Sequence, residues 1–540
     1  MINKIHISQT IETDLLIIGS GIAGLACAVE AEQAGIRMLL ATKTVIGSGA
    51  SYFPLKATLG IQVTGGAGDI ERFREDIERV ACGQNNPKIV QAYLEDSPQA
   101  IDLLSKIGFE PWQRQDNRPA CFAKYARPIF LINQWREAAK RAKQILAGQS
   151  TQILENATLV KIVSRENRVQ GAVLAVQTSG QIRYLFCQTP HIILASGGIA
   201  GLYQHNLYPA DVIGSTHFLA QQAGAKLVNL EFIQFIPAFV EPKYKVLFGE
   251  HTLKYVKKIT DHEGKDLFPH LTAEQFAAMV QMRSDYAPFS VDFASVEFDR
   301  VIMQYLLENP QAKSVYLHYD SAIYQDQTEF YRVYLQWLSQ EVGIDLVRDP
   351  IAIAPFAHSC NGGIEIDEFG ESAVQGLFAV GEVSACIEGA NRLGGNSVGG
   401  GLVFARRAVA KITERQKFSE IRPLAEAESL AKTTENQLNQ LANPNADPNL
   451  TASEVLQQIR TQMARFANVY RTEANLTQLL AELGRLEQQF CPITHHYHQG
   501  LEIYHALKTA QAVVSAMLNR KQSLGSHFRA DDQGEQAVGK

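Results

Sequence analysis

The chain has 540 residues, of which 46% are hydrophobic and 20% charged, and its formal net charge is −6. This is the composition of a globular protein of roughly two to four domains, and the lack of a strongly basic stretch excludes a nucleic-acid-binding surface. Seven scattered cysteines form no C-x-x-C pair. They therefore argue against an iron–sulfur cluster or structural metal site in this chain and favour a reducing compartment.

The first residues contain no apolar core of a signal peptide. The apolar stretch at 15–29 is too short to span a bilayer. We therefore expect a cytoplasmic enzyme that is not inserted directly into a membrane.

The first predicted elements form a strand–turn–helix–strand unit at 13–42, TDLLIIGSGIAGLACAVEAEQAGIRMLLAT. Its glycines Gly19, Gly21 and Gly24 have the G-x-G-x-x-G spacing of a dinucleotide-binding fingerprint. Gly19 permits a tight turn, Gly21 lets a pyrophosphate approach the backbone, and Gly24 allows close helix–strand packing. The N–H groups at the helix start would bind the phosphates. A glycine-rich packing turn is the alternative, and the complete strand–helix–strand context favours the fingerprint.

The second strand of this unit, at 36–41, ends without the acidic residue that usually contacts an adenosine ribose. Thr42 and Lys43 stand there instead. No arginine follows, so the change does not point to NADP. The ribose contact is therefore left open.

Three later stretches favour FAD over NAD. HIILASGGIAGLY (191–203) is a buried strand with a Gly-Gly turn, GLFAVGE (376–382) is a strand ending at Glu382, and GANRLGGNSVGGG (389–401) precedes a helical pattern. The Glu382 carboxylate is well placed to accept hydrogen bonds from hydroxyls of a ribose or ribityl chain. Glycines before a helix start indicate backbone N–H groups directed at an electron-rich group.

Read in order, the motifs G-x-G-x-x-G, A-S-G-G, H-S-x-N-G-G-I, G-L-F-A-V-G-E and G-A-N-R-L-G-x-N-S resemble the flavoprotein family of succinate dehydrogenase, fumarate reductase and L-aspartate oxidase. Further matches at 208–235, 468–476 and 523–531 extend the resemblance over nearly the whole chain. It implies an α/β fold with a Rossmann-like FAD-binding domain, an inserted α+β capping domain and a C-terminal helical domain. We expect the FAD-binding domain at 1–236 and 349–412, the capping domain at 237–348, and the helical domain at 413–540.

The resemblance implies FAD as cofactor, with the glycine-rich segment at 389–401 lying against the isoalloxazine. The family's covalent flavin link uses a histidine in the loop after the second strand, but the corresponding loop at 49–63 contains none. We therefore expect noncovalent FAD. The residues expected to contact FAD are Gly19, Gly21, Ala23, Gly24, Thr42, Lys43, Ser51, Lys56, Thr58, Ser196, Gly197, Glu382, Asn396 and Ser397.

Two residues are candidates for substrate binding. Arg392 has the planar guanidinium that suits a two-point clamp on a carboxylate, and the family places a substrate-binding arginine at this motif position. The family also places a histidine at the position of His358. The alternatives are a structural arginine paired with a carboxylate and a core histidine bonded to backbone.

The chain departs from the family where a second carboxylate would bind. In EFIQFIPAFVEP (231–242), Ile236 and Ala238 replace a histidine and a threonine. LFGEHTLKYVKKI (247–259) lacks the family's proton-delivering arginine, and Glu250, His251 and Lys254 are the nearest titratable residues. We take His251 as the catalytic candidate, although each of the three is also explained as a solvated side chain. No metal site is expected, because HHYH (495–498) lacks further ligands and is typical of a polar loop.

We therefore expect a flavin-dependent oxidoreductase that transfers a hydride between FAD and a small carboxylate-bearing substrate other than a plain C4 dicarboxylate. One alternative is an enzyme like L-aspartate oxidase or fumarate reductase with rewired proton delivery. The other is a flavoprotein subunit that only passes electrons. An iron–sulfur or other electron-transfer protein is the expected partner.

Overall fold

The computed structural model of the chain describes residues 4–53, 55–147, 151–285, 289–416, 424–493 and 497–532, without the side chains of 424–425 and 497–498. The HHYH segment at 495–498 therefore lies outside the described side chains.

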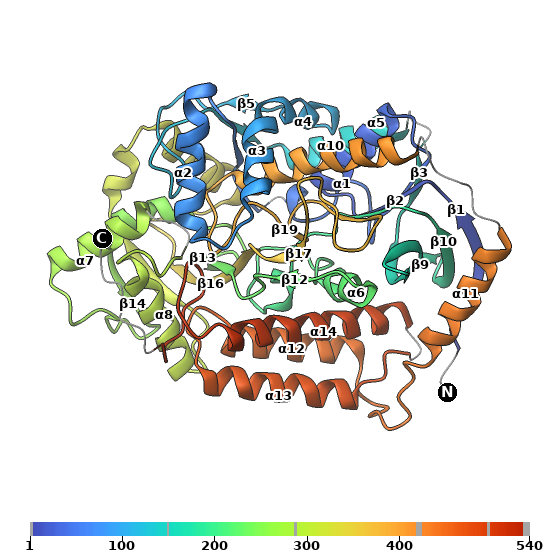
Figure 1. Cartoon of the computed structure of the whole chain (residues 1–540). Helices are drawn as coiled ribbons and strands as arrows, with labels where there is room; N and C mark the ends of the chain where they lie inside the picture. The colour runs from blue at the N-terminus through green and yellow to red at the C-terminus, as the bar shows by residue number, and fades with distance from the viewer. Residues whose placement is uncertain are drawn as a thin grey trace.

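A parallel sheet contains the first strand–helix–strand unit, whose strands β2 and β3 are labelled in Figure 1. The strand order of this sheet is β18-β11-β2-β3-β7. The strands are β2 (Leu15–Ile18), β3 (Met38–Ala41), β7 (Gln152–Leu154), β11 (Ile192–Leu194) and β18 (Leu377–Ala379). Every pair is parallel. All residues of β2, β3, β11 and β18 are buried, as their continuous apolar sequences require in a sheet covered on both faces.

Helix α1 (Ile22–Gln33) follows β2 and packs against α10 (Asn396–Gln416), so segments far apart in the chain lie side by side. The predicted helix start at Ile22 is confirmed, and the helix ends two residues before Gly35, whose φ of +69° glycine adopts without a Cβ clash. The neighbouring elements are β4 (Leu59–Gln62), α2 (Ile70–Ala81), α3 (Pro87–Ala100), α4 (Asp102–Lys106), β5 (Trp112–Gln113), β6 (Ile129–Ile132) and α5 (Trp135–Ala147).

Two further sheets have the strand orders β1-β10-β9-β8 and β12-β17-β19. Their strands are β1 (Ile7–Glu12), β8 (Ala157–Arg165), β9 (Arg168–Thr178), β10 (Gln181–Gln188), β12 (Leu227–Val228), β17 (Gly363–Glu365) and β19 (Ser384–Ala385). Helix α6 (Ser215–Ala223) packs against β8.

A four-stranded antiparallel sheet, β13-β16-β15-β14, forms a second body together with three helices. Its strands are β13 (Ile233–Glu241), β14 (Val256–Thr260), β15 (Val315–Tyr319) and β16 (Ile351–Cys360), and its helices are α7 (Ala273–Asp285), α8 (Val296–Glu308) and α9 (Glu329–Trp337). Strand β13 crosses the expected domain boundary at 236/237. The sheet therefore joins strands from both sides of that boundary.

The last part of the described chain is helical, as expected. It contains α11 (Leu424–Asn439), α12 (Ala452–Phe466), α13 (Glu473–Gln489) and α14 (Tyr497–Asn519), drawn in orange and red in Figure 1. Leu476, Leu479, Leu483 and Leu486 recur at helical spacing and are buried on one face of α13. Helix α14 also packs against α6. Within the described residues, no helix combines the length and apolarity needed to cross a membrane.

Candidate functional site

A long cavity runs along the carboxyl ends of the parallel strands. The segments that follow four of these strands line it, namely 19–23 after β2, 42–43 after β3, 195–197 after β11 and 380–382 after β18. Ligands of open parallel sheets bind in the crevice at this edge. The strand order therefore brings together residues that are far apart in the sequence.

The three fingerprint glycines have different surroundings. A Cβ on Gly19 would lie 2.3 Å from the Ala195 carbonyl oxygen, and one on Gly24 would lie 1.9 Å from that of Gly19. A Cβ on Gly21 would meet only the Ser51 Oγ, at 3.5 Å, and Gly21 lines the cavity. Gly19 and Gly24 are thus required by packing, whereas Gly21 keeps the cavity floor open.

Hydroxyl groups surround the start of helix α1. Ser51 Oγ accepts a hydrogen bond from the Ile22 N–H at 3.3 Å. The Ser20 and Thr42 hydroxyls are 2.8 Å apart, and those of Ser196 and Thr216 are 2.5 Å apart. These groups, with the free backbone N–H groups of the helix start, suit an anionic pyrophosphate.

Glu382 is held at the end of β18. Its Oε1 accepts hydrogen bonds from the Tyr208 hydroxyl and, at 2.9 Å, from the Cys360 N–H. Burial raises the pKa of Glu382, and these two donors oppose the shift. A Cβ on Gly198 would lie 2.5 Å from Glu382 Oε1, so this glycine makes room for the carboxylate.

Lys56 lines the cavity with a buried ammonium group. Its Nζ donates to the carbonyls of Phe53 and, at 3.0 Å, Ala50, and lies 4.0 Å from the centroid of the Trp135 ring. Burial lowers the pKa of Lys56 to about 7.

Arg392 lines the cavity and is bonded to three neutral side chains. Its Nε donates to Gln234 Oε1 at 3.0 Å, Nη1 to Ser397 Oγ at 2.6 Å, and Nη2 lies 3.0 Å from His358 Nε2. Ser397 in turn donates to Glu388 Oε1 at 3.2 Å. Among the described residues, no carboxylate bonds to Arg392 directly, and Glu388 reaches it only through Ser397. A structural arginine paired directly with a carboxylate therefore finds no partner among them.

His358 stands beside this guanidinium as a neutral ring. Burial lowers its pKa to about 3, and the charges of Arg392 and Lys56 act in the same direction. Because Arg392 can only donate, His358 Nε2 must accept, which leaves the ring proton on Nδ1. His358 also lines the cavity.

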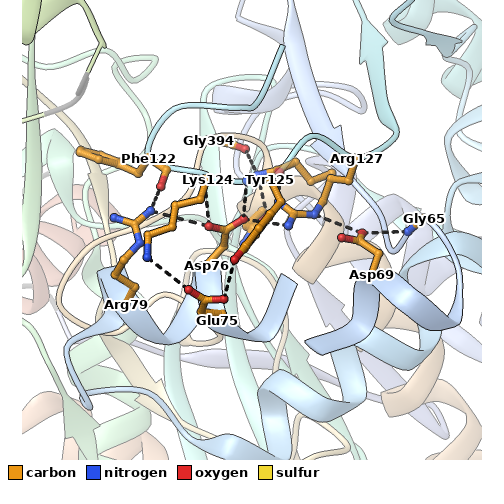
Figure 2. A network of polar contacts seen from close by, with 12 residues as sticks. Gly65, Asp69, Glu75, Asp76, Arg79, Phe122, Lys124, Tyr125, Arg127 and Gly394 are labelled. Carbon is orange, nitrogen blue, oxygen red and sulfur yellow. Dashed lines mark hydrogen bonds and ion pairs between the residues drawn. The ribbon is translucent and has the colours of Figure 1, made fainter. Parts of the chain in front are cut away.

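A buried network supports the glycine loop ahead of α10. Figure 2 shows Arg127 between Asp76 and Asp69; its Nη2 lies 2.8 Å from Asp76 Oδ2 and its Nε 3.3 Å from Asp69 Oδ2. Arg127 Nη1 donates to Gln62 Oε1 at 3.0 Å, and Gln62 Nε2 donates to the Gly394 carbonyl at 2.7 Å. A fully buried arginine thus fixes the loop that leads into α10.

The structure gathers most of the sequence-predicted residues along the cavity but leaves some outside it. Those lining it are Gly19, Gly21, Ala23, Thr42, Lys43, Ser51, Lys56, Ser196, Gly197, His358, Glu382, Arg392 and Ser397. Gly24, Thr58, Asn396 and His251 lie elsewhere. Gly24 serves packing, and the buried Asn396 faces Gln62 Nε2 at 3.4 Å.

His251 is enclosed by aromatic rings and does not join Arg392 and His358. Its ring centroid lies 4.2 Å from that of Phe330, and Tyr331 and Tyr334 pack around it. Burial lowers its pKa to about 3, so the ring is neutral at physiological pH. The structure therefore does not bring His251 together with Arg392 and His358, and its catalytic role stays a prediction.

Ile236 and Ala238 also lie outside the cavity lining. Both are buried in β13, and Ala238 packs with Ala354 and Phe356 of β16. These positions are therefore part of the sheet core rather than a polar binding surface.

Sequence reasoning missed several residues of the cavity, among them Tyr208, Asp211, Thr216, Lys245 and Glu502. Tyr208 and Asp211 stand in the 208–235 match but carry no local motif. Glu502 lies in α14, and only the fold brings it to the cavity. Burial lowers the pKa of Lys245 to about 8.

Comparison with known proteins agrees with this geometry. Residues 14–398 match the family model described as FAD binding domain, and 456–536 match fumarate reductase flavoprotein C-term. The chain is 26% identical to one subunit of the fumarate reductase (CoM/CoB) of Methanothermobacter marburgensis, over 97% of this chain and 95% of that one. It is 26% identical to L-aspartate oxidase of Bacillus subtilis, over 96% and 91% respectively. A solved chain of Escherichia coli quinol fumarate reductase shares the fold with a TM-score of 0.76, at 22% identity and covering 97% of this chain and 92% of that one.

The residues along the cavity fit FAD, because an open glycine floor, a helix start and the Glu382 carboxylate follow the same sheet edge. The predicted cofactor and family are thereby confirmed. The chain belongs to the FAD-dependent flavoprotein family of fumarate reductase, succinate dehydrogenase and L-aspartate oxidase, and it is an FAD-dependent oxidoreductase.

Proposed function

We propose that the protein transfers a hydride between FAD and a small carboxylate-bearing substrate, and that plain C4 dicarboxylates are poor substrates. FAD supplies the hydride chemistry when bound. One observation carries the proposal: a cavity-lining arginine has three neutral hydrogen-bond partners and no ion-pair partner among the described carboxylates. Glu388 is linked to Arg392 only through Ser397, so the guanidinium is free to contact a substrate carboxylate directly.

The hydrogen-bond count of Arg392 supports a two-point clamp. A guanidinium has five N–H donors, and Arg392 uses one each on Nε, Nη1 and Nη2. Among the described residues, one N–H on each Nη nitrogen has no partner. Both are available to a carboxylate, which a guanidinium can bind through two donors.

His358 is proposed to orient this clamp and to contact the substrate. Its neutral ring accepts from Arg392 Nη2 and leaves an N–H on Nδ1. A neutral histidine adds no second positive charge to the site. Its role is therefore to position the guanidinium and to donate a hydrogen bond, not to supply a charge.

The substrate preference follows from the donors that are missing from the cavity lining. Ile236 and Ala238 stand where the family carries a histidine and a threonine, and both are apolar and buried outside the lining, so these two positions supply no donor to a second carboxylate. A buried charge without a partner costs several kcal/mol, on the order of the penalty for an unpaired ion in a protein. Fumarate and succinate would therefore bind poorly unless another cation serves them.

We also propose that the cofactor is held noncovalently and that electrons pass to or from a partner protein. The loop at 49–63 has no histidine for a flavin link. The relative from Methanothermobacter marburgensis is one subunit of its enzyme, which supports a partner. Acid precipitation should release unmodified FAD; flavin that stays with the denatured pellet would contradict the noncovalent assignment.

Anaerobic photoreduction of the purified protein tests the proposed chemistry. The reduced flavin is mixed with a panel of unsaturated monocarboxylates, with their uncharged amides and with fumarate, and reoxidation is followed at the flavin absorption band. We expect some monocarboxylates to reoxidise the flavin, the matching amides to fail, and fumarate to react slowly. Fast reoxidation by fumarate, or equal reaction of acid and amide, would contradict the proposal.

A further inference from the structure

Helix α14 brings a buried carboxylate from the C-terminal helical part to the cavity of the parallel sheet. Glu502 is 5% exposed and lines the cavity. The helix is held in place because it packs against α6 and because Thr509 Oγ1 donates to the Gly214 carbonyl at 3.0 Å. The position of Glu502 is therefore fixed by the packing of two helices.

Among the described residues, one oxygen of this carboxylate has a partner and the other has none. Lys43 Nζ lies 2.6 Å from Glu502 Oε1 and also donates to the Asp211 carbonyl at 2.8 Å. Within the described part of the chain, Glu502 Oε2 accepts no hydrogen bond. A carboxylate has about four acceptor sites, so Glu502 has acceptor capacity left on the cavity side.

The place of Glu502 in the fold identifies the ligand group. Lys43 is the second residue after β3, the second strand of the strand–helix–strand unit. In dinucleotide-binding folds the acidic residue at this strand end accepts a hydrogen bond from the adenosine ribose. This chain has Thr42 and Lys43 there, with no acid. Glu502 of α14 brings a carboxylate to the same strand end, with its Oε1 2.6 Å from Lys43 Nζ.

We propose that Glu502 holds the adenosine ribose of FAD by accepting hydrogen bonds from its hydroxyl groups. Lys43 neutralises the charge of the buried carboxylate and binds its Oε1. The Oε2 atom is then available to the ribose hydroxyl groups. The C-terminal helical part would then bind the cofactor directly rather than only packing against the FAD-binding part.

Asp211 is the competing carboxylate. It lines the same end of the cavity but is half-buried, and its Oδ2 already accepts from Thr44 Oγ1 at 3.3 Å. Glu502 is more deeply buried than Asp211 and has an oxygen that accepts no hydrogen bond among the described residues, so it is the better ribose acceptor. Asp211→Asn therefore serves as a direct comparison.

Release of flavin from the holoprotein on dilution, followed by flavin fluorescence, measures the FAD dissociation constant. Glu502→Gln should raise it about 10- to 100-fold, the range expected for one or two charge-assisted hydrogen bonds. Holoprotein loaded by exchange with an FAD analogue that lacks the adenosine 2′-hydroxyl should lose flavin more easily than the FAD form. Glu502→Gln should abolish that difference. Glu487→Gln is the matched control, because it breaks a Glu–Lys pair with Lys508 outside the cavity. It should change neither the FAD dissociation constant nor the difference between FAD and the deoxy analogue.

Three results would overturn the proposal. The first is a Glu502→Gln variant that still distinguishes FAD from the deoxy analogue as the wild type does. The second is full recovery of FAD affinity in a Lys43→Met, Glu502→Gln double variant, which would mean that Glu502 only neutralises Lys43. The third is loss of ribose discrimination in Asp211→Asn but not in Glu502→Gln.

If Glu502→Gln does not fold, Glu502→Asp keeps the charge but withdraws the carboxylate by one methylene. Glu502→Asp should weaken the binding of FAD more than the binding of the deoxy analogue. An equal effect on the two dissociation constants would overturn the proposal.

Discussion

The edge of the parallel sheet and the antiparallel sheet β13-β16-β15-β14 differ in the kind of residue they present. The first is polar and rich in glycine, and the second is apolar. The parallel sheet ends in glycines, hydroxyl groups and the Glu382 carboxylate, all lining one cavity. The antiparallel sheet places Ile236 and Ala238 in a packed core, and the nearby His251 lies among aromatic rings. One region is therefore made to bind a large polar cofactor, while the other offers little to a second anionic group.

Arg392 lies between the two regions. It stands just ahead of α10, which packs on α1, and its Nε is bonded to Gln234 of β13. A substrate carboxylate on Arg392 would thus be held by the cofactor side of the molecule. The antiparallel sheet then limits the size and polarity of the rest of the substrate.

The largest effect is expected at Gly21. Gly21→Val should fold, because an added Cβ meets only the Ser51 Oγ at 3.5 Å, but its side chain would occupy the path of the pyrophosphate. We expect nearly complete loss of copurified FAD, measured from the ratio of flavin to protein absorbance. Gly484→Val is the control, since an added Cβ there would meet no described atom within 4 Å beyond its chain neighbours and the backbone of its own helix. Full flavin content in Gly21→Val would contradict the role given to this glycine.

Arg392→Lys should have the next largest effect. It keeps the charge but loses the planar fork, so turnover with the best carboxylate should fall about 100-fold or more. Flavin content should stay close to that of the wild type, because glycines and backbone groups hold the cofactor. Turnover and flavin content are measured on the same preparation.

Arg392→Ala provides the check on this interpretation. It should be no more active than Arg392→Lys. If both variants lose FAD while the remaining holoprotein turns over normally, Arg392 is structural, and His358 alone would not support a carboxylate site.

The sequence predicted the cofactor region well because its signals are local. Gly19, Gly21 and Gly24 fall within one turn and helix start, and their spacing is tied to backbone geometry. Glu382 was readable as the end of an apolar strand. In contrast, Glu502 lies in an ordinary helical segment. No local pattern shows that tertiary packing places its carboxylate beside Lys43.

The substrate side was less predictable for the same reason. The resemblance identified Ile236 and Ala238 as replacements, but not that both side chains are buried in the sheet away from the cavity. His251 looked titratable in the sequence, and its aromatic surroundings come from α9 far along the chain. The domain boundaries and the roles of individual site residues stay predictions.

Ile236→His tests whether the antiparallel sheet can be made polar. Ile236 is 5% exposed, so an imidazole there would bury polar nitrogens without prepared partners. We expect a loss of about 1–3 kcal/mol in the free energy of unfolding, the usual cost of an unsatisfied buried polar group. Urea unfolding measures this, with Ile236→Leu as the size-matched control. A stable variant that reduces fumarate rapidly would show that this position does face the substrate.

The smallest predicted effect concerns Lys56, where the loop after β3 meets the cavity. Burial lowers its pKa to about 7 from an unfolded value of 10.5. Between these pH values the unfolded chain carries a proton on Lys56 that the folded chain lacks, so the contribution of Lys56 to the free energy of unfolding rises with pH. The free energy of unfolding should increase through this group by about 1–2 kcal/mol from about pH 7 to about pH 8.5. Lys56→Met should lose that part of the pH dependence, while Lys88→Met, an exposed lysine, should keep it. Urea midpoints at both pH values and a fixed free FAD concentration make the comparison. Equal pH slopes in the wild type and Lys56→Met would mean that the ammonium stays charged over this range, held by the Ala50 and Phe53 carbonyls and the Trp135 ring.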